Sequence, residues 1–201
     1  MSTRWCLVIT AALSETRSVK RALIVIDVQE SFRQRANWAR SSNPGIVHKV
    51  TTLVELARRE GDLVAWILHA EPGTGTVFDP VSGHVRLIDG LVPVDGEPVI
   101  TKTSHNAFTT TNLQQLLTAR GTGELVISGI KTEQCCETTA RVGSDLGFGV
   151  TFVTDATATT PIPHWKSGKE LGTDEIIART EYALAGRFAT IATVAELAGI
   201  S

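Results

Sequence analysis

Residues 124–142 read ELVISGIKTEQCCETTARV, and this stretch decides the fold class. Its first part, through Ile127, is apolar and rich in β-branched side chains, which favours a buried strand. Gly129 breaks the run, and residues 137–142 can continue as a helix. In open α/β sheets such strand-to-helix turns lie at the carboxyl ends of the strands, where active sites form. The stretch therefore predicts an α/β protein with Cys135 in a candidate site, beside a helix N-terminus that favours its thiolate.

The rest of the chain repeats this alternation of strands and helices. Further strands are predicted over residues 21–27, 63–68, 98–101, 150–153 and 188–191. Further helices are predicted from residue 43 to an end at Gly61, over 110–119 and from 173. Residues 71–97 and 155–169 are predicted to be long loops, which in a compact domain usually serve a site or an interface. No internal repeat or linker is visible, so we expect one parallel-sheet domain over residues 20–201. Residues 1–19 are expected to form an N-terminal extension.

The composition restricts the class of protein. The chain has 201 residues, of which 42% are hydrophobic and 20% are charged, as in soluble globular domains. Its net charge is −2, so we expect no nucleic-acid partner. No apolar run reaches the about 20 residues of a membrane helix, so we expect no membrane partner. Three cysteines, two of them adjacent, cannot make a disulfide framework, which favours a reducing, cytoplasmic location. Residues 5–13 faintly resemble a signal-peptide core, and secretion stays an alternative.

Three reactive side chains fall at the ends of three predicted strands: Asp27, Lys102 and Cys135. A carboxylate near a thiol can accept its proton, and a lysine near both favours the thiolate and keeps the carboxylate ionised. Each residue alone has an ordinary explanation. An aspartate after a strand is commonly a turn residue, a loop lysine is commonly solvated, and a single cysteine is commonly part of the core. Their position at one edge of the sheet favours nucleophilic catalysis.

Three groups of residues also carry a resemblance to a known family. They are residues 22–29 with Phe32, residues 101–102 with Ala107, Phe108 and Leu113, and residues 129–135 with Thr139, Ala140, Asp155 and Ala156. In order and spacing, from about Lys20 to the C-terminus, they resemble the isochorismatase-like cysteine hydrolases. This superfamily includes nicotinamidases and N-carbamoylsarcosine amidohydrolase. The resemblance implies a three-layer α/β/α sandwich with a largely parallel six-stranded sheet.

The same resemblance implies roles for particular residues. It implies a catalytic triad of Asp27, Lys102 and Cys135, with Cys135 as the nucleophile, and a cis peptide bond between Ile130 and Lys131. The backbone N–H groups of Lys131 and Cys135 would form an oxyanion hole, in which losing one donor typically costs about 10²–10³ in rate. The expected reaction is hydrolysis of a small amide or ureide substrate through a thioester. Members of this family form homo-oligomers, so the resemblance also implies a homo-oligomer here.

Two differences from the sequences of related enzymes restrict the expected metal use and substrate class. Zinc-dependent nicotinamidases carry an Asp-x-His and a further His after the second strand, and residues 68–73 lack that set, so we expect no metal and no cofactor. True isochorismatases lack the nucleophilic cysteine, which disfavours a vinyl-ether substrate. A catalytically silent member that binds a small molecule or responds to redox state stays an alternative, as does hydrolysis of another bond. A dinucleotide-binding dehydrogenase is disfavoured because no Gly-x-Gly-x-x-Gly turn follows the first strand.

Several other side chains could line the site. Phe32, Arg33 and Trp38 in the first loop and His69 after the second strand are candidates for substrate binding, and structural roles are equally open. Cys136 lies one position past the expected nucleophile, about 100° around a helix, so we expect it in the core.

Overall fold

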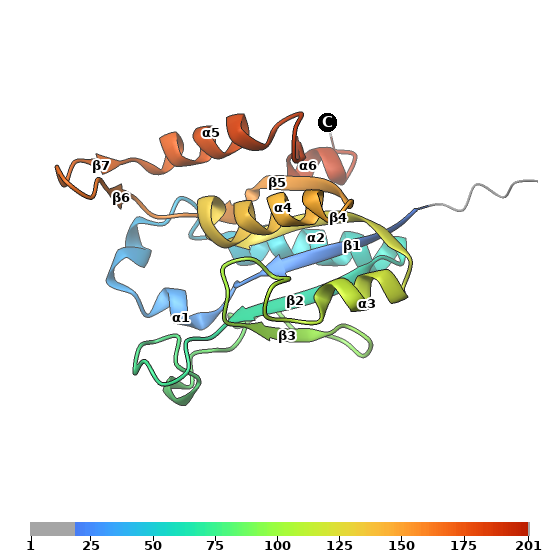
Figure 1. Ribbon diagram of the computed structural model, residues 1–201, viewed down its shortest axis with the longest axis horizontal. Coiled ribbons are helices and arrows are strands. Elements are labelled where there is room, and N and C mark those ends of the chain that lie inside the picture. The colour runs from blue at the N-terminus through green and yellow to red at the C-terminus, as the bar shows by residue number, and fades with distance from the viewer. Residues whose placement is uncertain (1–18, 201) are drawn as a thin grey trace, which may run out of the picture.

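The computed structural model describes residues 19–200, and six of its strands form one sheet (Figure 1). These strands are β1 (Lys20–Ile26), β2 (Leu63–His69), β3 (Val99–Lys102), β4 (Thr122–Ile130), β5 (Gly149–Ala158) and β8 (Thr190–Ala192). Their order is β3-β2-β1-β4-β5-β8, and all neighbouring pairs are parallel. β1 and β4 lie at the centre, and β3 is an edge strand. The expected six-stranded parallel sheet is confirmed. The signal-like run over residues 5–13 and most of the expected extension lie outside the described residues.

Helices cover both faces of this sheet (Figure 1). One face carries α2 (Ile46–Glu60) and α6 (Val194–Leu197), and the other carries α3 (Leu113–Ala119), α4 (Glu137–Asp145) and α5 (Thr173–Leu184). The remaining short elements are α1 (Glu30–Arg33), η1 (Ala36–Arg40), η2 (Pro80–Ser82), the π-helical turn η3 (Thr132–Cys136) and a hairpin of β6 (Ile162–Pro163) and β7 (Glu170–Leu171). The three-layer α/β/α architecture is therefore confirmed. Within residues 19–200, no helix is long and apolar enough to cross a membrane.

Burial on both faces explains the continuous apolar run of β1. Leu23 and Val25 belong to the core under α2, whereas Ile24 and Ile26 belong to the core under α3 and α4. Fully burying each such side chain contributes about 1.5–3 kcal/mol. α2 supplies its face of the core with residues three or four apart, Ile46, Val50, Leu53, Val54 and Ala57. This helix ends where Gly61 adopts a left-handed conformation with φ 74°, as its sequence predicts.

Several predicted boundaries differ from the structure, and two of these differences have a clear physical cause. β5 continues to Ala158, so residues 155–169 are not one long loop but the end of a strand followed by the β6–β7 hairpin. A register shift between Ile127 and Gly129 of β4 allows β5 to pair again at Thr157 and Ala158, and the polar residues in between hide this strand from its sequence. The helix predicted from residue 110 begins at Leu113, because Oγ1 of Thr110 accepts hydrogen bonds from the N–H groups of the preceding turn.

At Gly129 the two central strands lie too close together for a side chain. Its φ is 134°, and a Cβ atom at this position would lie 1.9 Å from the carbonyl oxygen of Ile26. Only glycine fits such an approach. The contact brings the end of β1, which leads into Asp27, against the end of β4, which leads into the turn that carries Cys135.

Candidate active site

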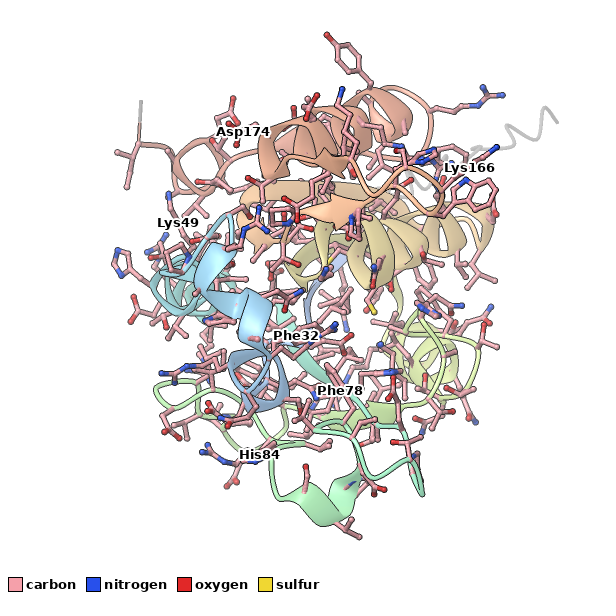
Figure 2. The ribbon with its side chains drawn as sticks, turned by 90° about the vertical axis from the view of Figure 1, so that its left-hand side faces the viewer. Phe32, Lys49, Phe78, His84, Lys166 and Asp174 are labelled. Atoms are coloured by element: carbon pink, nitrogen blue, oxygen red, sulfur yellow. The ribbon has the colours of Figure 1, made fainter. Side chains whose placement is uncertain are left out.

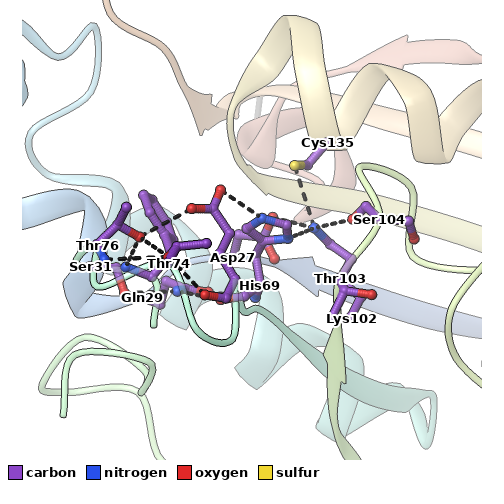
Figure 3. A network of polar contacts seen from close by, with 12 residues as sticks. Asp27, Gln29, Ser31, His69, Thr74, Thr76, Lys102, Thr103, Ser104 and Cys135 are labelled. Carbon is purple, nitrogen blue, oxygen red and sulfur yellow. Dashed lines mark hydrogen bonds and ion pairs between the residues drawn. The ribbon is translucent and has the colours of Figure 1, made fainter. Parts of the chain in front are cut away.

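The side chains of Asp27, Lys102 and Cys135 meet at the carboxyl edge of the sheet (Figure 3). Asp27 follows β1, Lys102 ends β3, and Cys135 lies in η3, directly after β4. Nζ of Lys102 donates to Oδ2 of Asp27 at 2.8 Å and to Sγ of Cys135 at 3.4 Å. All three residues are buried, and Asp27 and Lys102 are 0% exposed. One buried ammonium group therefore contacts both a carboxylate and a thiol sulfur.

The same ammonium group has two further acceptors. The carbonyl oxygen of Ser104 lies 3.1 Å from Nζ of Lys102, and Nδ1 of His69 lies 3.4 Å away. An ammonium group carries three hydrogens, whereas the structure offers it four acceptors. Lys102 is thus held in place from four directions.

The backbone aims Asp27 into the site. Asp27 has a φ of 53°, and it is the one non-glycine residue with a positive φ among residues 19–200. Its N–H donates to the carbonyl oxygen of Ile67 at 2.9 Å, which continues the β1–β2 ladder by one step. Oδ1 of Asp27 has no hydrogen-bond partner among the described residues. One oxygen of the carboxylate is therefore fixed by Lys102 and the other is free to accept a proton.

Burial dominates the protonation states of the three groups. Burial raises the pKa of Asp27, although Lys102 acts in the opposite direction. Burial also disfavours the charged form of Lys102, but the charges of Asp27 and Cys135 outweigh it and raise the pKa of Lys102 above its ordinary value. Burial, and then the charge of Asp27, raise the pKa of Cys135 to about 12, against the effect of Lys102. Cys135 is therefore a thiol at neutral pH.

This result corrects the expectation that a helix N-terminus favours a thiolate at Cys135. The residue does not sit exposed at the start of α4 but inside η3, where it is 7% exposed. In that position the loss of hydration and the nearby carboxylate raise the pKa of the thiol more than the ammonium group of Lys102 lowers it.

The turn before Cys135 has the backbone that the family resemblance implies. The peptide bond between Ile130 and Lys131 is cis. The carbonyl oxygen of Lys131 accepts hydrogen bonds from the N–H groups of Gln134 and Cys136, at 3.2 and 3.1 Å, which close the turn. Oγ1 of Thr132 lies 2.8 Å from Oγ1 of Thr157, and this contact ties η3 to β5. Cys136 is 0% exposed in the core under α3 and α4, as its position predicts.

Comparison with known proteins assigns the family. The model of the isochorismatase domain matches residues 21–181. The chain belongs to the isochorismatase family. It is 33% identical over 139 residues to an uncharacterized isochorismatase family protein of Bacillus subtilis, covering 69% of this chain and 74% of that protein. It is 32% identical over 152 residues to nicotinamidase 3 of Arabidopsis thaliana, covering 69% and 73%. A crystal structure of an isochorismatase-family protein from Chromobacterium violaceum aligns with a TM-score of 0.83 and 27% identity over 90% of this chain and 93% of that one.

The four candidates for substrate binding fall into two groups in this isochorismatase-family fold. Phe32 packs edge-on against Phe78, with ring centroids 5.0 Å apart, and His69 packs against the same ring at 5.8 Å. Figure 2 looks onto the carboxyl edge of the sheet and shows Phe32 and Phe78 near its middle. Arg33 and Trp38 instead line a separate hollow of about 280 Å³, whose lining includes none of Asp27, Lys102 and Cys135. The structure therefore brings His69, but not Arg33 or Trp38, to Lys102.

Gln29 is a site residue to which sequence reasoning gave no role. It is 0% exposed, and its side-chain amide bonds both backbone groups of His69: Nε2 donates to the carbonyl oxygen at 3.0 Å, and Oε1 accepts from the N–H at 2.7 Å. Gln29 thereby fixes the end of β2 beside the end of β1. The signal available in the sequence was a glutamine two positions after Asp27 and next to the apolar Val28.

One histidine and one further carboxylate, those of His69 and Glu71, lie beside Asp27, Lys102 and Cys135. His69 and Glu71 lie 3.4 Å apart, between Nε2 and Oε1. Within residues 19–200 no group of three or more His, Cys, Asp or Glu side chains is arranged to hold a metal ion. A hydrolytic zinc site ordinarily uses three protein ligands.

Proposed function

We propose that this isochorismatase-family protein is a cysteine-dependent hydrolase of a small substrate, acting on an amide- or ureide-type C–N bond through a thioester. The observation that carries the proposal is the buried contact of Lys102 with both Asp27 and Cys135. The family includes hydrolases, and the similarity to a nicotinamidase supports an amide substrate. A cysteine, a carboxylate and a cation in hydrogen-bond contact are the parts that thiol-based acyl transfer requires.

The first step of the proposed reaction is attack by sulfur. Because burial raises the pKa of Cys135 to about 12, the thiol is the dominant form at pH 7. The thiol proton must therefore leave as the S–C bond forms, and the unpartnered Oδ1 of Asp27 is the group that can take it. Burial raises the proton affinity of this carboxylate, which suits a base for a weakly acidic thiol.

The later steps reuse the same groups. The carbonyl oxygen of the substrate gains negative charge in the tetrahedral intermediate, and the N–H groups of Lys131 and Cys135 are the donors proposed to stabilise it. Asp27 then gives its proton to the leaving nitrogen, the C–N bond breaks, and ammonia or an amine departs. Water loses a proton to Asp27 and attacks the thioester, the C–S bond breaks, and the thiol of Cys135 regains the proton.

A substrate panel tests this proposal. Small carboxamides, carbamoyl compounds and ureides are each incubated with the protein, and ammonia release is measured before and after treatment with a chelator. We expect turnover of at least one class, unchanged by chelation, and a mass increase at Cys135 when the reaction is quenched by acid. If the Cys135→Ser variant turns over substrate without forming a covalent intermediate, the thioester mechanism is contradicted. Activity that is lost to the chelator and restored by zinc would contradict the metal-free mechanism.

A further inference from the structure

His69 meets Lys102 in a way that the proposed reaction does not yet use. Nζ of Lys102 has three hydrogens. Two have acceptors at ordinary hydrogen-bond distances, Oδ2 of Asp27 at 2.8 Å and the carbonyl oxygen of Ser104 at 3.1 Å. Two acceptors remain for the third hydrogen at equal distances of 3.4 Å: Sγ of Cys135 and Nδ1 of His69. The imidazole and the sulfur therefore compete for one hydrogen (Figure 3).

The tautomer of His69 follows from its two neighbours. An ammonium group can only donate, so Nδ1 accepts and carries no hydrogen. The hydrogen then resides on Nε2, which lies 3.4 Å from Oε1 of Glu71. Oε2 of that carboxylate in turn accepts from the hydroxyl of Thr76 at 3.1 Å. Glu71 thus orients the ring so that its unprotonated nitrogen faces Lys102.

The electrostatic surroundings keep this ring neutral. Burial, and then the charge of Lys102, lower the pKa of His69, although Asp27 and Glu71 act in the opposite direction. These are the charged groups that face the ring from the ends of β3, β1 and β2 in the described part of the chain. At neutral pH the imidazole is therefore an acceptor rather than a second cation beside Lys102.

We propose that His69 is a positioning residue that takes the third hydrogen of Lys102 whenever the sulfur of Cys135 is not a thiolate. This inference rests on the proposed role of Cys135 as nucleophile. A thiol or a thioester sulfur is a weak acceptor, so the hydrogen goes to Nδ1 of His69 in the resting protein and in the acyl intermediate. When the sulfur becomes anionic it takes the hydrogen, because a charged acceptor makes the stronger bond. Forming the thiolate then costs the Lys102–His69 bond.

This competition predicts the direction in which a substitution of His69 changes the ionisation of Cys135. Removing the acceptor at Nδ1 takes away a contact that exists only in the thiol state, so the thiolate of Cys135 becomes easier to form. Two substitutions separate the hydrogen bond from packing. The side-chain oxygen of asparagine falls near the position of Nδ1, whereas that of glutamine falls near Nε2. Thus H69N retains the acceptor facing Lys102 and H69Q removes it, while both keep a polar side chain of similar size.

The experiment measures the rate at which iodoacetamide alkylates Cys135 at a fixed pH of about 9, with the modified residue identified by mass spectrometry. We expect alkylation in H69Q about tenfold faster than in wild type, which corresponds to a pKa lowered by about one unit, and in H69N within about twofold of wild type. Equal rates in the two variants, or slower alkylation in H69Q, would overturn the proposal. No substrate enters this measurement, so a substrate panel without turnover would count against the proposed hydrolase and leave the role of His69 standing.

A second measurement on the wild-type protein covers the case in which H69Q does not fold. The nitrogen chemical shifts of the His69 ring distinguish the two tautomers directly. We expect hydrogen on Nε2 and a hydrogen-bonded, unprotonated Nδ1, both before and after alkylation of Cys135. Hydrogen on Nδ1 at neutral pH would overturn the proposal, because that nitrogen could not accept from Lys102.

Discussion

Oδ2 of Asp27 accepts a 2.8 Å hydrogen bond from Nζ of Lys102 across the full width of strand β2, which separates the strands β1 and β3 that position them. Both residues are 0% exposed. The pair is therefore buried, and each charge depends on the other for compensation.

Replacing one partner of this ion pair should destabilise the protein more than replacing both partners. We expect Lys102→Met to lower the free energy of unfolding by about 3–5 kcal/mol, since it leaves a buried carboxylate unpaired. Adding Asp27→Asn should recover a large part of that loss. Chemical denaturation of wild type, both single variants and the double variant measures the coupling. Lys49→Met is the matched control, because Lys49 pairs with Asp155 at 2.8 Å with both side chains partly exposed, and its loss should cost about 0–1 kcal/mol. If the stability losses of Asp27→Asn and Lys102→Met simply add in the double variant, the prediction is wrong.

The two adjacent cysteines should behave differently. Cys135→Ser should lower the turnover of any substrate by at least about 10³-fold, because it removes the proposed nucleophile. Cys136→Ala should keep most of the activity and lose about 1 kcal/mol of stability, because Cys136 packs in the core and makes only a small cavity when shortened. Initial rates and thermal melting of both variants check this. A reversed pattern would place the nucleophile one residue later.

The thiol of Cys135 should be slow to ionise. Because its pKa is raised to about 12, alkylation by iodoacetamide should become about tenfold faster for each unit of pH from 7 to 10, without a plateau. Lys102→Met should slow alkylation at every pH, since the ammonium group lowers the pKa of the thiol. A plateau below pH 9 would show that the helix terminus, rather than burial, sets the ionisation of this cysteine.

Gly129→Ala should disrupt the junction of the two central strands. The added methyl group would lie 1.9 Å from the carbonyl oxygen of Ile26, so one strand must move, and we expect a loss of about 3 kcal/mol or more. Gly147→Ala is the control, because Gly147 also has a positive φ of 90° but open space around it, and it should lose about 1–2 kcal/mol. Equal denaturation midpoints in the two variants would mean that backbone conformation, not the close approach, matters at Gly129.

We also predict that the protein is a homo-oligomer in solution. Trp165, in the loop of the β6–β7 hairpin, is 88% exposed, an unusual position for a tryptophan in an isolated chain. Light scattering at working concentration should give a multiple of the chain mass, and Trp165→Ser should lower that multiple. A monomer in the wild type would contradict this prediction.

The sheet and its core were predictable because apolar periodicity reports burial directly. The runs that became β1, β2 and β4 are apolar on both faces, and only a parallel sheet between two helix layers satisfies them. The end of β5 was not predictable, because Thr154, Asp155 and Thr157 interrupt the apolar pattern where the strand bulges.

The positions of the site residues followed from strand ends, but their chemistry depended on contacts that no sequence pattern records. Lys102 and Cys135 could be placed at one edge of the sheet from the sequence. The degree of burial that keeps Cys135 a thiol could not, because it depends on how deeply η3 packs. The two hydrogen bonds between the side-chain amide of Gln29 and the backbone of His69 could not be predicted either, since the two residues are 40 positions apart.

The position of β3 at the edge of the sheet has a consequence for partial unfolding. Lys102 stands on a four-residue strand that pairs on one side only, whereas Asp27 and Cys135 lie beside the two central strands. Edge segments open with smaller free energies than the centre of a sheet. The cation is therefore the first member of the site to be released when the protein is stressed. Activity should be lost at the denaturant concentration at which the amides of residues 99–102 lose protection from hydrogen exchange. This concentration should be lower than the one at which β1 and β4 lose protection.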